Sequence, residues 1–190
     1  MKIGVLALQG AFAEHEKVLE QLGAGCIELR QDRDLSEPYD ALVLPGGEST
    51  VQGKLLKELG MFDIMKSQIE NGMPVLATCA GAILLAETID GQMKGQPEQY
   101  FGTIPMCIKR NAYGRQLGSF HTEASVAGIG TVPMTFIRAP YIASVGSGVE
   151  VLAVVEERIV GVKHKNQMAF SFHPELDPDV RIHKAFLEMI

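Results

Sequence analysis

The sequence predicts an α/β fold with an open, mostly parallel central sheet, helices on both faces and antiparallel additions. In the first half of the chain, short apolar runs alternate with segments whose apolar residues recur at helical spacing, which is typical of a parallel sheet covered on both faces. In the second half, strand-like runs follow one another across glycine-rich turns, as in antiparallel additions to such a core. With 190 residues, of which 46% are hydrophobic, we expect one domain that spans residues 1–190.

The first half is expected to hold four strands and four helices. The strand segments are short and almost wholly apolar, because both faces of a parallel sheet are buried. Turn residues end several elements: Gly23 ends the first helix, Pro45-Gly46-Gly47 the third strand, and Asn71-Gly72 the third helix. The expected strands are residues 2–8, 26–30, 41–44 and 75–78, and the expected helices are residues 11–22, 49–59, 61–70 and 80–88.

The second half is expected to be mainly strand, closed by one helix. Ser-Gly and other glycine-rich turns separate several apolar runs here, which favours antiparallel neighbours. The expected strands are residues 102–109, 116–123, 131–137, 149–155, 158–162 and 168–172, and the closing helix is expected at residues 179–189.

Composition excludes several classes of protein. The net charge is −6 and there is no basic run, so neither nucleic acid nor an anionic membrane is an expected partner. No apolar run approaches the roughly 20 residues of a membrane-spanning helix, and residues 1–9 lack the features of a signal peptide. Three widely spaced cysteines support neither a disulfide framework nor a zinc site, so we expect a cytoplasmic protein without a metal.

The first candidate for chemistry is Cys79, which stands where a buried strand passes straight into a helix. Ala77, Ala80 and Gly81 surround it, and a nucleophile on a sharp strand-to-helix turn needs such small neighbours. The helix N-terminus favours the thiolate, and the free N–H groups of the first turn can stabilise an oxyanion. The alternative is a buried structural cysteine.

A candidate base follows another apolar strand. Phe172-His173-Pro174-Glu175 places an imidazole and a carboxylate two residues apart, on the same side of an extended segment. Glu175 would then orient His173, and His173 would activate Cys79 in a Cys-His-Glu triad. By itself His-Pro-Glu also fits an ordinary surface histidine. Sites in parallel sheets gather at the carboxyl ends of strands, where both segments are expected.

A third element is the loop Pro45-Gly46-Gly47-Glu48-Ser49, which follows the third strand. Its glycines allow close approach of the backbone and leave N–H donors free. The carboxylate of Glu48 would suit the amino group of an amino-acid substrate. An ordinary tight turn with a helix cap is the alternative, and the absence of Gly-Lys-Ser/Thr excludes a nucleotide-type phosphate loop.

Together these motifs resemble a known family. Pro-Gly-Gly-Glu-Ser-Thr (45–50), Thr-Cys-Ala-Gly (78–81) and Ser-Phe-His-Pro-Glu (171–175) resemble the class I, triad-type glutamine amidotransferases, which implies their flavodoxin-like fold. Leu-Gln-Gly (8–10), Arg-Asn-Ala-Tyr-Gly-Arg-Gln (110–116) and Phe-Ile-Arg-Ala-Pro (136–140) narrow the resemblance to glutaminase subunits of pyridoxal 5′-phosphate synthase.

The resemblance implies a role for each matching residue. Cys79 is implied as nucleophile, His173 as base and Glu175 as the residue that orients it. Ala80 and a Gly46–Gly47 amide are implied as oxyanion donors, and Gln9 and Gly10 as a contact with the synthase. The implied glutamine-binding residues are Gly47, Glu48, Ser49, Arg110, Ile137 and Arg138.

The implied reaction is hydrolysis of L-glutamine to L-glutamate and ammonia, with no cofactor. The ammonia would pass to a separate synthase subunit, in a hetero-oligomeric complex that makes pyridoxal 5′-phosphate. Two alternatives stay open. One is a glutaminase subunit for imidazole glycerol phosphate, anthranilate or guanine nucleotide synthesis. The other is a non-glutaminase relative on the same fold, such as a chaperone-like or peptidase-type protein.

The remaining histidines and cysteines are given structural interpretations. Nothing in the local sequence suggests chemistry for His15, His121, His164 or His183. Cys26 and Cys107 lie in apolar strand segments, so we expect them in the core.

Overall fold

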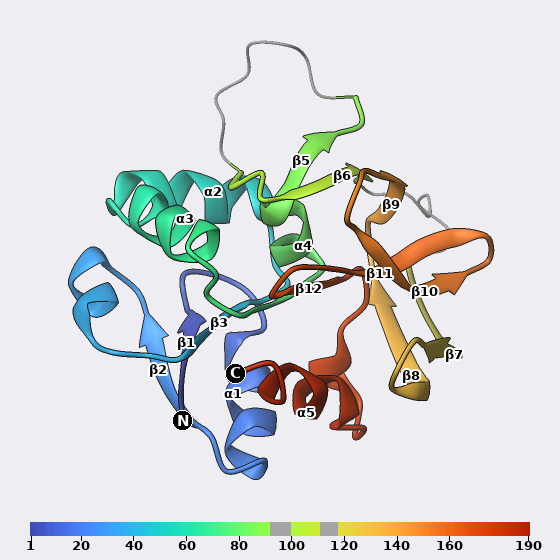
Figure 1. Ribbon diagram of the computed structural model, residues 1–190, viewed down its shortest axis with the longest axis horizontal. Helices are drawn as coiled ribbons and strands as arrows, with labels where there is room; N and C mark the ends of the chain where they lie inside the picture. The colour runs from blue at the N-terminus through green and yellow to red at the C-terminus, as the bar shows by residue number, and fades with distance from the viewer. Residues whose placement is uncertain (92–99, 111–117) are drawn as a thin grey trace.

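The computed structural model describes residues 1–91, 100–110 and 118–190, and confirms the predicted fold class (Figure 1). Its strands form one sheet in which five parallel strands lie side by side. No helix in the described ranges is long and apolar enough to cross a membrane. In spatial order the parallel strands are β2 (Gly25–Leu29), β1 (Lys2–Leu6), β3 (Ala41–Leu44), β4 (Val75–Thr78) and β12 (Gln167–Phe170).

Antiparallel strands extend the sheet beyond β12. Strand β11 pairs antiparallel with β12 and with β10, and β10 pairs in turn with β7. A branch runs from β11 through β9 to β6, which pairs in parallel with β5. The bounds are β5 Ala86–Ile89, β6 Ile104–Lys109, β7 Ser119–Val126, β8 Gly130–Ile137, β9 Tyr141–Val145, β10 Glu150–Val155 and β11 Arg158–His164.

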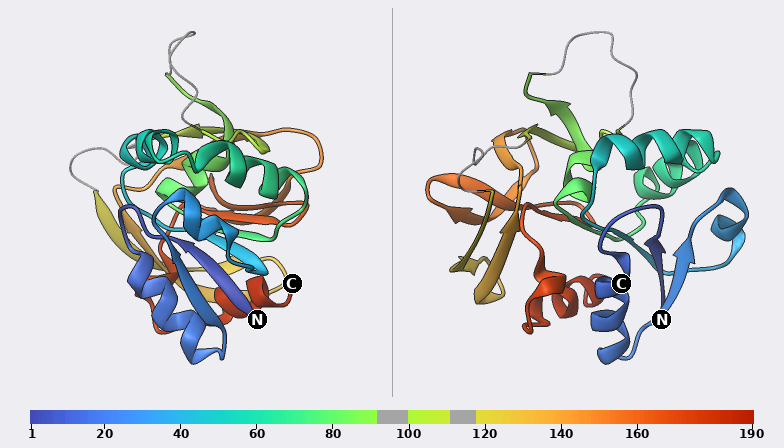
Figure 2. Two further views of the ribbon diagram at one scale, coloured as in Figure 1. Left: turned by 90° about the vertical axis from the view of Figure 1, so that its left-hand side faces the viewer. Right: turned by 180° about the vertical axis from the view of Figure 1, so that it is seen from behind.

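Helices cover both faces of the parallel strands, as Figure 2 shows from two further sides. On one face lie α2 (Ser49–Glu58), α3 (Phe62–Glu70) and α4 (Ala80–Leu85). On the other lie α1 (Phe12–Gln21) and α5 (Arg181–Leu187), side by side. Two short 3₁₀ helices, η1 (Asp32–Ser36) and η2 (Pro174–Leu176), complete the described secondary structure.

Each face of the sheet has its own hydrophobic core. Along β3, Leu42 and Leu44 pack with residues of α2, α3 and α4, whereas Ala41 and Val43 pack with residues of α1 and α5. This alternation follows from the two-residue period of a strand. Because both faces are buried, every residue of β3, β4 and β12 is buried, and the strands are continuous apolar runs in the sequence.

Strand β12 brings a distant part of the chain to β4. Gln167 pairs with Val75 and Phe170 with Thr78, so the two strands end at the same edge of the sheet. The N–H of Cys79 donates a hydrogen bond of 2.8 Å to the carbonyl oxygen of Phe170, one step past the strand end. The segments that follow β1, β3, β4 and β12 therefore meet at one edge, where parallel sheets hold their ligands.

Two sequence predictions need correction. The helix expected at residues 80–88 ends at Leu85, and residues 86–89 form β5 instead. All six residues of α4 are buried, so the helix lies wholly in the core, and pairing with β6 then decides the conformation of Thr88 and Ile89. Strand β9 was not predicted, since it depends on its partners β6 and β11 rather than on local pattern.

The other predicted elements are present with shifted ends. The first strand stops at Leu6 rather than at residue 8, and the closing helix covers Arg181–Leu187 within the expected 179–189. The strand expected at 116–123 is observed as Ser119–Val126, and residues 116 and 117 lie outside the described residues. Such shifts are usual because local pattern does not define where pairing stops.

Candidate active site

Cys79 occupies a strained turn between β4 and α4. Its backbone angles are φ 47° and ψ −102°, in a region that residues other than glycine rarely adopt. The turn is possible because α4 lies very close to β3. A Cβ on Gly81 would stand 2.9 Å from Leu44 Cβ and would clash with the Leu44 carbonyl oxygen. The strained turn directs the thiol to the end of the sheet, as in a nucleophile elbow.

His173 and Glu175 meet Cys79 from the end of β12. The His173 N–H donates to the Thr135 carbonyl oxygen at 2.8 Å, which ties the segment to β8. The His173 Nδ1 atom lies 2.7 Å from Glu175 Oε1, and the ring lies beside the Cys79 thiol, which contributes to raising the pKa of His173. Since Nδ1 is engaged by the carboxylate, Nε2 is the atom left for sulfur. The structure thus brings together the three residues that the sequence analysis selected.

The electrostatics of this group favour charged partners. Burial by itself would lower the pKa of His173, but hydrogen bonds with Cys79 and Glu175 outweigh it and raise the pKa to about 10. Burial by itself would raise the pKa of Glu175, and the neighbours His15 and His173 more than reverse this and lower it. The result is an imidazolium that is held by a carboxylate and lies beside the sulfur of Cys79.

Gly46 packs directly against the catalytic candidates. A Cβ on Gly46 would lie 2.9 Å from His173 Nδ1 and 3.3 Å from Cys79 Cβ, and would clash with His173 Cε1. The Gly46 N–H donates to Thr78 Oγ1 at 3.1 Å, and the Gly46 carbonyl oxygen accepts from the Ala11 N–H at 3.1 Å. This position therefore needs a residue without a side chain, and both of its backbone polar groups are in use.

The peptide between Gly46 and Gly47 presents its N–H to the site. In a trans peptide the N–H points opposite to the carbonyl. The Gly46 carbonyl oxygen accepts from the Ala11 N–H, so the Gly47 N–H points away from Ala11. The Ala80 N–H is the first amide of α4 and has no intrahelical acceptor. Gly47 and Ala80 are thus the candidate oxyanion donors, and the Gly46 N–H is not.

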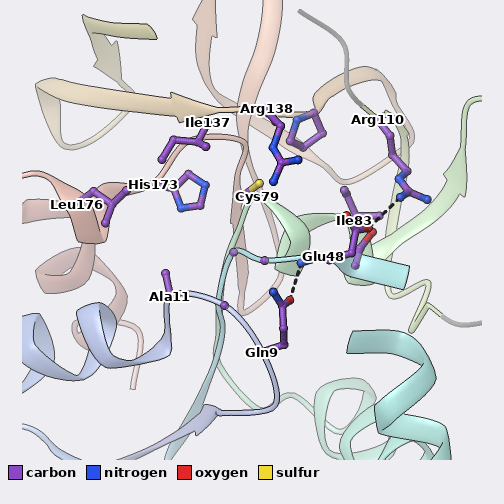
Figure 3. Close-up of a pocket in the computed structure, with 15 residues that line it drawn as sticks. Gln9, Ala11, Glu48, Cys79, Ile83, Arg110, Ile137, Arg138, His173 and Leu176 are labelled. Atoms are coloured by element: carbon purple, nitrogen blue, oxygen red, sulfur yellow. Dashed lines mark hydrogen bonds and ion pairs between the residues drawn. The ribbon is translucent and has the colours of Figure 1, made fainter. Parts of the chain in front are cut away.

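The side chains of two glutamines form hydrogen bonds that hold the loop of residues 45–48, the glycine loop, in place. The Gln9 side-chain oxygen accepts from the Glu48 N–H at 2.7 Å (Figure 3). The Gln52 amide donates to the carbonyl oxygens of Gln9 and Pro45, at 2.9 and 3.2 Å. Gln9, expected at a partner surface, therefore also fixes the conformation of the loop that carries Gly47.

A cavity of about 260 Å³ opens above Cys79. At its mouth Arg110 donates to Glu48 Oε1 at 3.1 Å, and Arg138 points toward Cys79 (Figure 3). The backbone of Arg138 has φ 43°, a second strained residue at the site, and its N–H donates to the Gly118 carbonyl oxygen. The cavity thus joins a nucleophile to a carboxylate and two guanidinium groups.

The cavity contains most of the predicted site and some residues that sequence reasoning missed. Glu175 lies behind His173 rather than in the wall, and residues 111–117 of the predicted 110–116 segment lie outside the described residues. The predicted residues in the wall are Gln9, Gly10, Gly46, Gly47, Glu48, Ser49, Cys79, Arg110, Ile137, Arg138 and His173, and the missed ones are Ala11, Ile83, Pro140 and Leu176. Ala11, Ile83 and Leu176 are apolar and carry no motif, whereas Pro140 ends the quoted segment 136–140 but was given no role of its own.

Two further histidines, to which the sequence analysis assigned no role, lie behind the triad candidates. The fully buried His15 has its Nε2 atom 3.3 Å from Glu175 Oε2 and 3.1 Å from Thr78 Oγ1. Its Nδ1 atom lies 2.9 Å from Nε2 of His183, also fully buried. Burial lowers the pKa of His15, and it lowers that of His183 to about 3. No local signal reveals them, because α1 and α5 meet only in the fold.

The remaining histidines and cysteines have structural positions. His121 Nδ1 lies 3.1 Å from Thr135 Oγ1, and His164 Nδ1 lies 2.9 Å from the Gly148 carbonyl oxygen, both at exposed positions. Cys26 and Cys107 are half-buried rather than in the core, which corrects the sequence expectation. Burial raises the pKa of the Cys26 thiol to about 11. Within the described residues, no group of three or more His, Cys, Asp or Glu side chains could hold a metal ion.

The packing of Gly46 predicts a loss of thiol reactivity when a methyl group is added. In Gly46→Ala the new Cβ displaces His173 from Cys79, so we expect alkylation of Cys79 by iodoacetamide at pH 7 to slow by about tenfold or more. Peptide mapping follows the label at Cys79. Gly25→Ala is the control, because a Cβ there meets nothing closer than 3.8 Å. Equal rates in both variants would contradict the packing argument.

The two buried neutral histidines predict that stability falls in mild acid. The unfolded chain takes up protons on His15 and His183 near their ordinary pKa of 6.5, whereas the native state does not. Below pH 6.5 the free energy of unfolding should therefore fall as the pH falls. For His183, whose native pKa is about 3, the slope approaches about 1.4 kcal/mol per pH unit on the way to the Glu175 reference value of 4.5. His15 adds a fall in the same direction. His173 is protonated in the native state but only partly protonated in the unfolded chain near pH 6.5, so it opposes the fall at the upper end of this range and adds nothing well below it.

Urea unfolding at a series of pH values measures this slope. His183→Asn removes one of the two histidines, so its free energy of unfolding should change less steeply with pH, by the contribution of His183. His164→Asn is the control variant, because His164 lies outside the buried pair. An unaltered slope in His183→Asn would show that His183 is protonated in the native state.

Comparison with known proteins agrees with this geometry. The model of the SNO glutamine amidotransferase family matches residues 5–190. Pyridoxal 5′-phosphate synthase subunit PdxT of Desulfitobacterium hafniense (strain Y51) is 59% identical over 190 residues, with 100% of this chain and 94% of the relative covered. PdxT of Streptococcus pneumoniae serotype 2 (strain D39 / NCTC 7466) is 54% identical over 192 residues, with 100% and 97% covered. A crystal structure described as a glutamine amidotransferase superposes with a TM-score of 0.92 at 44% identity, covering 98% of this chain and 97% of that one. The chain belongs to the SNO glutamine amidotransferase family.

Proposed function

We propose that this protein is the glutaminase subunit of a pyridoxal 5′-phosphate synthase. It hydrolyses L-glutamine to L-glutamate and ammonia, and it supplies the ammonia to a separate synthase subunit. The observation that carries the proposal is the placement of Cys79, His173 and Glu175 at the base of a cavity whose mouth holds Glu48 and Arg110. The names of the PdxT relatives, at 54–59% identity over the full chain, support the identity of the complex.

The charges around the cavity fit the two ends of an amino acid. The Glu48 carboxylate suits the α-ammonium group of glutamine, and the guanidinium groups of Arg110 and Arg138 suit its α-carboxylate. Glu48 and Arg110 pair with each other at 3.1 Å, and a zwitterionic ligand would insert between them. The side-chain amide would then lie deeper, near Cys79, with Ile137 and Ile83 beside the methylene groups.

The first half of the reaction uses the charged pair. The thiolate of Cys79 attacks the side-chain carbonyl carbon, and the N–H groups of Gly47 and Ala80 stabilise the oxyanion. The imidazolium of His173, held by Glu175, donates its proton to the leaving nitrogen. The C–N bond breaks, ammonia leaves, and a thioester joins glutamate to Cys79.

The second half needs His173 as a base rather than an acid. Part of the rise in the pKa of His173 comes from Cys79, and a thioester sulfur carries no negative charge. Acylation therefore lowers the pKa of His173 and leaves the ring neutral, which suits it to accept a proton from water. The water attacks the thioester, glutamate leaves, and the thiolate–imidazolium pair is restored.

The contact with the synthase is proposed at Gln9 and Gly10. These residues lie in the cavity wall, and the Gln9 side chain and the Ala11 N–H hold the loop that carries the Gly47 N–H. A partner that orders this segment would also order the oxyanion donor, since it favours the loop conformation to which it binds best. We place the complex in the cytoplasm, because the three cysteines of the chain are free.

We also propose that residues 1–190 form a single glutaminase domain. A glutaminase that serves a different acceptor would share the same triad, and the identity of the PdxT relatives favours the pyridoxal phosphate route. A non-glutaminase relative would not need charges matched to an amino acid at the cavity mouth.

Selective labelling tests the nucleophile. A glutamine analogue with an electrophile in place of the amide should label Cys79 only. Burial raises the pKa of the Cys26 thiol, and Cys107 does not line the cavity that contains Cys79. Cys79→Ala should lose about a thousandfold or more of glutamate release, while Cys107→Ala should retain it. Mass mapping that finds the label mainly on Cys26 or Cys107 would overturn the assignment.

Partner dependence tests the proposed contact. Adding the synthase subunit at saturating glutamine should raise glutamate release by at least about tenfold, which corresponds to only about 1.4 kcal/mol of barrier. Gln9→Ala should reduce this rise, because it removes the acceptor of the Glu48 N–H. Equal rates with and without the synthase subunit would exclude the coupling, while leaving the triad assignment intact.

A further inference from the structure

The mechanism leaves one atom of the triad without a described function. Oxygen Oε1 of Glu175 binds His173, whereas Oε2 is fully buried and has no hydrogen-bond partner of ordinary geometry among the described residues. A buried carboxylate oxygen without a donor is costly, by several kcal/mol for a charged group. The group that lies against it is Nε2 of His15, at 3.3 Å.

We propose that His15 and His183 are positioning residues for Glu175, with His15 donating its Nε2–H toward Oε2 and His183 holding His15 in the tautomer that can donate. This inference rests on the proposed function and extends the triad by two residues behind the carboxylate. His15 comes from α1 and His183 from α5, so three elements fix one carboxylate.

The position of His15 explains why its contact with Oε2 is long. The same Nε2 atom lies 3.1 Å from Thr78 Oγ1 and 3.3 Å from Glu175 Oε2. One N–H shared between two acceptors makes two bent contacts instead of one straight one. Thr78 Oγ1 also accepts the Gly46 N–H, so His15 touches both the carboxylate of the triad and the anchor of the glycine loop.

The choice of tautomer follows from the surrounding groups. If His15 carried its proton on Nδ1, its Nε2 lone pair would face Glu175 Oε2, and His183 would have to hold a proton on its buried Nδ1, which has no partner. With the proton on His15 Nε2, Nδ1 accepts from the Nε2–H of His183 at 2.9 Å. Of the ring nitrogens of the two histidines, only His183 Nδ1 is then left unpaired, as a lone pair, and a buried acceptor without a partner costs less than a buried donor.

A neutral donor is what this place requires. Burial lowers the pKa values of His15 and His183, so both rings carry no charge at neutral pH. A cationic His15 would compete with His173 for the negative charge of Glu175. A neutral imidazole orients the carboxylate by its N–H dipole and leaves that charge to His173.

Matched amide variants separate positioning from simple packing. The side-chain nitrogen of glutamine reaches the place of histidine Nε2, whereas that of asparagine reaches only the place of Nδ1. In the complex with the synthase subunit, His15→Asn should lower kcat by about tenfold or more, with KM within about twofold. His15→Gln should recover at least about half of kcat. At position 183, kcat should likewise be higher for His183→Gln than for His183→Asn. This second pair tests the proposal if His15→Asn does not fold.

A second readout does not depend on glutamine. The rate of Cys79 alkylation at pH 7 should follow the same order, Gln variant above Asn variant, because a misplaced Glu175 weakens the imidazolium that favours the thiolate. His164→Asn is the surface control and should match the original chain. Circular dichroism and thermal unfolding give the folded fraction of each variant.

The outcomes are distinct. If the original complex releases no glutamate, the proposed function fails, and the alkylation rates alone decide the role of His15 and His183. If the Gln and Asn variants at both positions have equal kcat and equal alkylation rates per folded molecule, the two histidines only fill space and the proposal is overturned.

Discussion

A single buried negative charge, on Glu175, organises the end of the sheet. Its side chain is fully buried, and a carboxylate in such a place is stable only with donors around it. The structure provides a cation on one side, His173 at 2.7 Å, and a neutral imidazole on the other, His15 at 3.3 Å. In the proposed mechanism the reactivity of Cys79 depends on this arrangement indirectly, because Glu175 helps to raise the pKa of the imidazolium beside the sulfur.

Close packing sets the second condition of the site. Gly46 lies against His173 and Cys79 with no room for a methyl group, and Gly81 lets α4 approach β3 to within contact of Leu44. The strained backbone of Cys79, at φ 47°, is held between these two tight contacts. Strain of this kind costs about 1–3 kcal/mol and lasts only where the surrounding packing leaves no alternative.

The sequence predicted the layers of the fold and the centre of the site for a physical reason. Fully buried parallel strands are continuous apolar runs, and short motifs with a strict backbone requirement, such as Gly46-Gly47 and Thr78-Cys79-Ala80-Gly81, stand at their ends. What it could not supply depends on contacts between distant elements. Strand β5 exists because β6 pairs with it.

The contacts of His15 with Glu175 and His183 are of the same kind. They exist because α1 and α5 lie side by side, and nothing in either helix indicates a neighbour in the other. The apolar wall residues Ile83 and Leu176 likewise have no signal of their own, since an apolar side chain has the same pattern in a core and in a cavity.

The parallel pairing of β12 with β4 has a consequence for how the protein folds. Val75 of β4 pairs with Gln167 of β12, so this edge of β4 stays unpaired until residues far along the chain reach it. No strand nearer in the sequence takes this position, because β12 lies between β4 and β11 in the sheet. Closing so long a loop carries an entropic cost before any contact rewards it, so the pairing belongs to the slow, non-local steps of folding. Until it forms, β4 presents an open, apolar edge that can pair with other chains. The same step brings His173 to Cys79, so the proposed triad assembles only when the sheet closes and the edge of β4 is covered.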